Sequence, residues 1–99
     1  MIIKRVTKNE LIKHVSQHTY VSQAVARCVI NEFMAVIIEE LARNHRVELR
    51  RFGTFTPRTS QARLINTTTG KSVRISARKL AKFHDGSDMR RRLNQDRDR

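Results

Sequence analysis

The sequence predicts an α+β fold: two N-terminal helices, a three-stranded antiparallel sheet with a long basic β-arm, and a short C-terminal helix. Two observations lead to this fold class. Residues 24–43 carry apolar residues at helical spacing, which indicates an amphipathic helix. Residues 47–76 alternate with the period of strands and turn at Thr69-Gly70-Lys71, which favours a hairpin. The middle of that hairpin has too few apolar residues to bury, so it would be only marginally stable alone.

Length and composition indicate one small domain. The chain has 99 residues and a single cysteine, so an intrachain disulfide is impossible and a reducing compartment is expected. Met1–Val6 is too short and too charged for a signal peptide, and no run is long enough to span a bilayer. We therefore expect a soluble, cytoplasmic protein with no membrane partner.

The distribution of charge points to nucleic acid. The net charge is +12, and residues 1–42 contribute only +1 of it, whereas residues 43–92 contribute +11. Basic charge gathered in one half of a chain is typical of nucleic-acid binding. The alternative is a basic face that serves only solubility. A membrane-surface helix is disfavoured because the basic residues lie mostly on strand-like sequence.

The first helix is expected over residues 8–18. Thr7 and Glu10 have the spacing of a capping box, in which the Thr7 hydroxyl accepts from the N3 amide. His14 and His18 lie four residues apart on this helix, a spacing that could hold a metal ion. No further ligand is placed to complete a shell, so we expect solvated histidines and no metal site.

The second helix is expected from Ala24 to about Arg43, with Ser22 as its N-cap and Asn44 as a cap of positive φ after it. Its apolar side exceeds half the circumference, which is wider than one neighbouring helix requires. So short a chain cannot cover the surplus, and we infer a homodimer or a paralogous heterodimer. The expected dimer core comprises Val29, Phe33, Met34, Ile37, Phe52 and Phe55.

The strands are expected to begin with Arg46–Arg50. Gly53 would allow a tight turn or close packing between the first and second strands, and Pro57 would lie at a free edge or at a bulge where the arm leaves the body. The returning strand would run through Ile75, Ala77 and Leu80 and end near Lys82.

A short helix over 88–93 would follow, with Phe83 packed inward and with Met89 and Leu93 facing the body. The expected division of the single domain is an extension at 1–6, a helical dimerisation part at 7–45, a sheet at 46–82 with its arm at about 58–74, a C-terminal helical part at 83–95 and a disordered tail at 96–99.

In this order of elements the chain resembles the bacterial histone-like HU/IHF family of DNA-bending proteins. The motifs that carry the resemblance are Arg51-Phe52-Gly53-Thr54-Phe55, Ala62-Arg63, Asn66 and Thr69-Gly70-Lys71, and it covers residues 7 to about 95. The resemblance implies an intertwined dimer whose two arms reach around a DNA duplex in the minor groove. The arm contacts it implies are Arg58, Arg63, Ile65, Asn66, Thr67, Lys71 and Arg74, and the implied body contacts are Arg78, Lys79, Lys82 and Arg90.

Departures from the family pattern affect the bending mechanism. Thr67 occupies the place of the proline that the family wedges between base pairs, and threonine is a poorer wedge because its hydroxyl stays hydrated. Either the arm follows the groove and kinks DNA less sharply, or Ile65 has become the wedge. Arg51 and Asn44 each replace a usual glycine, and nothing in the sequence explains the charge at Arg51.

The expected function is therefore architectural: binding and bending of double-stranded DNA with little sequence specificity, in association with the nucleoid. The alternatives are a sequence-specific, IHF-like bending cofactor and a basic RNA- or protein-binding assembly module. We expect no enzymatic activity, cofactor or small-molecule substrate, because the sequence has no paired carboxylates, phosphate-binding glycine loop or activated nucleophile.

Overall fold

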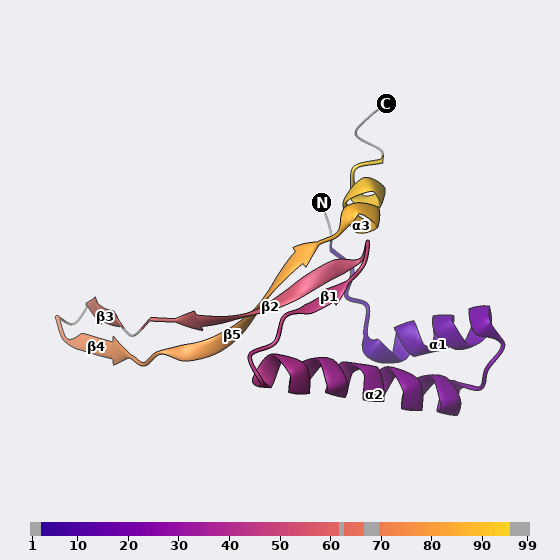
Figure 1. Cartoon of the computed structure of the whole chain (residues 1–99), viewed down its shortest axis with the longest axis horizontal. Coiled ribbons are helices and arrows are strands. Elements are labelled where there is room, and N and C mark those ends of the chain that lie inside the picture. Colours follow the sequence, from indigo (N-terminus) through magenta and orange to yellow (C-terminus); the bar gives the residue numbers. More distant parts are fainter. Residues whose placement is uncertain (1–2, 62, 67–69, 96–99) are drawn as a thin grey trace. The chain divides into compact units, whose positions relative to one another are not determined.

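A computed structural model describes residues 3–61, 63–66 and 70–95 (Figure 1). The chain divides into two compact units, residues 1–38 and 39–99. The elements follow in the order α1 (Lys8–Thr19), α2 (Gln23–Ala42), β1 (Val47–Leu49), β2 (Gly53–Ser60), β3 (Arg63–Asn66), β4 (Ser72–Ile75), β5 (Arg78–Asp85) and α3 (Ser87–Leu93). This confirms the α+β fold class with its basic hairpin. The last residues of α2 belong to the second unit.

Local capping signals fix the ends of α1. The Glu10 N–H donates to Thr7 Oγ1 at 3.4 Å, as the capping box predicts. At the other end Tyr20 has a φ of 62°, and its N–H donates to Ser16 O. The helix is thus one residue longer than expected, because this left-handed residue closes its last turn.

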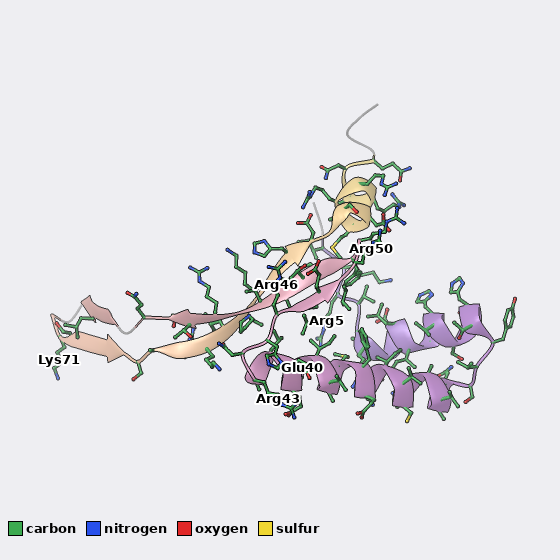
Figure 2. All side chains as sticks on the ribbon, in the orientation of Figure 1. Arg5, Glu40, Arg43, Arg46, Arg50 and Lys71 are labelled. Atoms are coloured by element: carbon green, nitrogen blue, oxygen red, sulfur yellow. The ribbon has the colours of Figure 1, made fainter. Side chains whose placement is uncertain are left out.

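The second helix also ends on a backbone motif. Its start is capped by Ser22, whose Oγ accepts from the Val25 N–H at 3.1 Å. At its end Asn44 has a φ of 68°, its N–H donates to Leu41 O, and the His45 N–H donates to Glu40 O. This is a Schellman motif with asparagine in the position that favours glycine, which confirms the predicted cap. The neighbouring hydrogen bond between His45 Nδ1 and Glu40 Oε2, 2.7 Å long, lowers the pKa of the Glu40 carboxyl (Glu40 is labelled in Figure 2).

The first unit has a very small core. Ile12 and Ala26 are its buried apolar residues among those the structure describes. Two polar contacts join the helices at the surface, Lys8 Nζ to Asn31 Oδ1 and Arg27 to Asn9 Oδ1, each 2.8 Å long. Burial of one isoleucine and one alanine contributes only a few kcal/mol, at about 25 cal/mol per Å². The helices therefore leave most of their apolar surface uncovered.

The sheet has the order β1-β2-β5, and both strand pairs are antiparallel. Gly53 is buried where β2 pairs with both neighbours, opposite Leu49 on β1 and Asp85 on β5. A Cβ at this position would overlap the Phe83 ring and would lie 2.8 Å from the His84 carbonyl oxygen. Glycine is therefore required here, but for the close approach of β5 and not, as expected, for packing between the first and second strands.

The arm continues the β2–β5 ladder. Ser60 pairs with Arg78, and after an interruption Arg63 pairs with Ile75, so each strand has advanced by three residues and the register is kept. The hairpin turns back between Asn66 and Ser72, and Gly70 in that connection has a φ of 84°. Pro57 lies beyond Phe55, the last residue of β2 paired with β1, so one edge of the strand is free there, as predicted.

Two expectations about the returning strand are wrong. The return is divided into β4 and β5 by an interruption at Ser76 and Ala77. The final strand does not end near Lys82 but runs to Asp85, because the β2 pairing extends to Gly53. Leu93 lines an apolar concavity with Met89 and Phe52, although it is 70% exposed. The expected disordered tail at 96–99 lies outside the described residues.

Among the described residues, no single helix is long and apolar enough to cross a membrane. The two N-terminal helices pass the length and composition criteria only together, as a pair bent by 119°.

Candidate nucleic-acid interface

The register of β2 and β5 sorts their side chains onto two faces. Successive residues of a strand point to opposite faces, and directly paired residues share a face. The residues that share one face, here called the basic strand face, are Thr54, Thr56, Arg58, Ser60, Arg78, Leu80, Lys82 and His84. None of these eight residues is acidic, but Glu48 of β1 pairs with Thr54 and therefore lies on the same side of the sheet at its base. This face therefore combines three permanent cations, one histidine and three hydroxyls.

The opposite face of the same hairpin is apolar near its base. It carries Phe55 and Phe83, whose ring centroids lie 4.9 Å apart, and the Phe52 ring packs edge-on to Phe83 at 6.0 Å. Phe83 thus packs against aromatic neighbours as predicted, although 40% of it is still exposed. This contact fixes which face is apolar and which is basic.

The three predicted body contacts on β5 do not all lie on the same face. Arg78 and Lys82 lie on the basic strand face with Arg58, whereas Lys79 pairs with Thr59 and lies on the opposite face. All four cations are exposed. In the sequence these residues form one basic run, and only the pairing with β2 assigns each of them to a face.

One member of the basic strand face was missed. His84 pairs with Thr54 and shares the face of Lys82 two residues away. The signal was present in the sequence, since the basic residues at 78, 82 and 84 have the same parity. It could be used only once the strand was known to extend past Lys82.

The arm carries the remaining predicted contacts. In the backbone register Arg63 pairs with Ile75, Ile65 with Val73, Asn66 with Ser72, and Leu64 with Arg74. The side chains of Arg63, Ile65, Asn66 and Arg74 lie outside the described part of the structure, as does the whole of Thr67. Lys71 is exposed beside Gly70 at the tip of the hairpin (Figure 2).

Arg90, the fourth predicted body contact, lies on α3 and not on the strand face. Its guanidinium donates to Asp85 O at 3.0 Å and lies 3.5 Å from Asp85 Oδ2. It is therefore tethered to the end of β5 and linked to the sheet through that strand.

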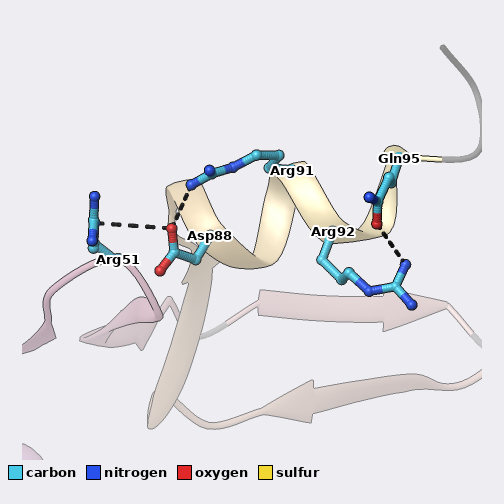
Figure 3. A pocket seen from close by; sticks show the side chains of 5 residues that line it. All are labelled: Arg51, Asp88, Arg91, Arg92 and Gln95. Carbon is cyan, nitrogen blue, oxygen red and sulfur yellow. Dashed lines mark hydrogen bonds and ion pairs between the residues drawn. The ribbon is translucent and has the colours of Figure 1, made fainter.

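The β1–β2 turn packs against the start of α3. Arg51 in this turn has a φ of 71°, and its carbonyl oxygen accepts from the Asp88 N–H at 2.9 Å. The Gly86 N–H donates to Phe52 O at 2.8 Å, and a Cβ on Gly86 would lie 2.6 Å from the Arg51 carbonyl carbon. Figure 3 shows the Arg51 side chain directed at Asp88, with its Nε 3.9 Å from Asp88 Oδ1. The charge that the sequence left unexplained thus forms an ion pair with α3.

The expected dimer core is largely uncovered within one chain. Val29 is 61% exposed and Phe33 is 52% exposed, and Met34 and Phe52 are exposed as well. Ile37 and Phe55 are half-buried. Exposed apolar side chains of this size are typical of surfaces that another chain covers.

Two other sequence features do not form a site. His14 and His18 stack with ring centroids 6.4 Å apart on α1, and the described residues contain no group of three metal-ligating side chains. Cys28 is exposed on α2.

Comparison with known proteins gives the same architecture. The model of the bacterial DNA-binding protein family matches residues 6–94. An HU protein from Anabaena, solved as a cocrystal with DNA, matches with a TM-score of 0.82 at 27% identity, over 89% of this chain and 97% of that chain. A mutant HU from Thermotoga maritima matches with a TM-score of 0.67 at 19% identity, over 89% of this chain and 99% of that chain, a likeness that shows the fold alone.

The fold and its basic hairpin define an architectural DNA-binding protein. The chain belongs to the bacterial DNA-binding protein family, the histone-like HU family, as its motifs indicate.

The conformation of Arg51 gives a stability prediction. A non-glycine residue in the left-handed region costs about 1 kcal/mol, and an exposed ion pair returns less than that. We expect the Arg51→Gly variant to have a higher free energy of unfolding than Arg51→Ala by about 1 kcal/mol. Arg51→Ala is the matched control, because it loses the same charge and keeps the unfavourable φ. Chemical denaturation at one chain concentration measures both, and equal stabilities would show that the turn is unstrained.

Proposed function

We propose that the chain acts as a dimer that binds and bends duplex DNA, with two β-arms following the minor groove and the basic strand face beneath the duplex. The observation that carries this proposal is the continuous register from the sheet into the arm, with Arg58, Arg78 and Lys82 on one face of it. Glu48 of β1 pairs with Thr54 at the base of this face, but three cations against one carboxylate leave it net positive, and such a face attracts a polyanion. Arg63, Asn66, Lys71 and Arg74 add the further contacts that the family resemblance implies for the arm.

Surface area supports the dimer. The chain exposes 9168 Å². A compact monomer of 11.6 kDa would expose about 5,800 Å². The apolar residues of α2, together with Phe52, account for part of the excess. We propose that a second copy or a paralogue covers them and that the two chains intertwine.

Charge and groove shape favour weak sequence preference. Lysines and arginines that neutralise phosphates release counterions, a term that is independent of sequence. The minor groove distinguishes A·T from G·C pairs but carries little further information. A bend adds preference for flexible or pre-bent sites. IHF-like specificity would require a sequence-dependent deformation cost, and footprinting on a genomic library separates the two cases.

The remaining expectations become part of the same proposal. Residues 1–99 act as one DNA-binding domain, with 7–45 for dimerisation, the arm at about 58–74 and a short extension at 1–6. In a bacterium such a protein would associate with the nucleoid in the cytoplasm. Imaging of the fluorescently tagged chain tests this, and a signal that does not follow the DNA stain would contradict it.

Titration of the purified chain onto duplexes tests the main proposal. If the dimer neutralises about 6–10 phosphates, the affinity for DNA should fall by roughly 10³–10⁵ between 50 and 200 mM salt. Nicked duplex should bind more tightly than linear duplex because it bends at lower cost. Light scattering on the same samples should give the mass of two chains. A folded single chain, or equal binding of nicked and linear duplex, would contradict the dimer or the bending respectively.

Two lysines on β5 test the assignment of faces. Lys82→Ala should weaken DNA binding and reduce the salt slope by about 1 for each phosphate that the lysine no longer neutralises. Lys79→Ala removes the same charge three residues away, from the opposite face, and should change the slope much less. Gel-shift titrations at several salt concentrations measure both slopes. Equal effects of the two substitutions would mean that only net charge matters.

The arm tip gives a further prediction. If Ile65 is the wedge in place of the usual proline, Ile65→Ala should reduce the DNA bend angle, since wedging unstacks a base step. Fluorescence transfer between the ends of a labelled duplex measures the angle. An unchanged angle would leave the alternative, in which the arm follows the groove without wedging.

A further inference from the structure

We propose that Asp88 is a built-in counterion that a phosphate displaces, so that Arg51 and Arg91 form a second phosphate-binding site at the base of the sheet. This inference rests on the proposed DNA binding and adds a site away from the arm and the basic strand face. It concerns residues 51 and 88–95, all within the second unit.

The geometry places one carboxylate between two guanidinium groups. Asp88 Oδ1 accepts from Arg91 at 2.6 Å and lies 3.9 Å from Arg51 Nε (Figure 3). Arg51 comes from the β1–β2 turn and Arg91 from α3. Together with Arg92 and Gln95, they line a concavity with a volume of about 460 Å³.

The charges in this concavity do not balance. Three arginines face one carboxylate, and Arg92 is held by the neutral Gln95 at 3.0 Å. A site with a net charge of two positive units is suited to an anion with more oxygens than a carboxylate offers. A phosphate presents several acceptor oxygens, and guanidinium groups bind them in a bidentate manner.

Displacement of Asp88 should be easy. Its side chain is 51% exposed, and those of Arg51 and Arg91 are 66% and 71% exposed. Exposed ion pairs contribute little to stability, so breaking one to bind a phosphate costs little free energy. The Arg51 backbone is held by the Asp88 N–H and by close packing on Gly86, so the turn stays in place when the side chains exchange partners.

The length of the hairpin determines how long a DNA duplex must be to reach this site from the arm. Gly53 and Asp85 form the base of the β2–β5 ladder, and Asn66 and Ser72 form the last pair of the arm. These pairs are at most about 43 Å apart at roughly 3.3 Å per residue. That length corresponds to about 13 base pairs. A duplex bound by the arm must therefore be long enough to reach the base.

Asp88→Asn tests the inference, because it keeps the shape of the side chain and removes the competing charge. We expect it to tighten binding to a duplex of about 40 base pairs by roughly three- to tenfold at 100 mM salt and to steepen the salt slope by about 1–2. A duplex of about 8 base pairs is shorter than this span, and its binding should not change. In an Arg51→Ala/Arg91→Ala background, Asp88→Asn should have no effect on either duplex.

Glu39→Gln is the matched control. It removes one negative charge from an exposed carboxylate of α2, outside the concavity and away from the basic strand face. An equal gain in affinity from Glu39→Gln and Asp88→Asn would overturn the inference, as would an equal gain on both duplex lengths. Thermal melts of each variant exclude unfolding as the cause.

A second measurement distinguishes DNA from a free anion as the source of the phosphate. Addition of inorganic phosphate to the Asp88→Asn variant is followed through the Arg51 and Arg91 Nε–H resonances. Shifts there with unchanged affinity for the long duplex would overturn the DNA site in favour of a small anion. If the wild-type chain bound neither duplex, the proposed function would fail, independently of this site.

Discussion

The antiparallel register between β2 and β5 is the constraint on which the other features depend. Because that ladder runs without a shift from Gly53 to Ser60, every side chain on the hairpin is assigned to one of two faces. A slip of one residue would move Phe55 and Phe83 onto opposite faces of the pair and mix the cations with the aromatic rings. Gly53 helps to prevent this, since the Phe83 ring occupies the space that a Cβ would need.

The two helices bury very few residues, and this bears on how the arm could work. Ile12 and Ala26 alone contribute little to holding two helices together, and in the proposed dimer burial against the second chain would supply most of the stability. An arm that binds DNA well needs a base that is already ordered, because ordering on binding would reduce affinity. Dimerisation would thus stabilise the fold and also fix the two arms before they meet a duplex.

The parts of the fold that the sequence could predict are those set by neighbouring residues. Thr7, Ser22 and Asn44 carry their own capping chemistry, and the structure places the helix ends within one residue of the expected positions. The end of β5 could not be predicted in this way, because Phe83, His84 and Asp85 are strand residues only through pairing with β2. The same pairing decides that Lys79 and Lys82 lie on different faces.

The conformation of Arg51 cannot be predicted from its neighbours in the sequence. Its left-handed backbone would suit glycine, and the interactions that compensate come from Gly86 and Asp88, more than thirty residues later in the chain. The arginine conformation costs about 1 kcal/mol, whereas an exposed pair at 3.9 Å returns only a fraction of that. Stability alone therefore does not account for arginine at this position. The proposed role of its charge in binding a phosphate would account for it, and strained residues of this kind cluster at functional sites.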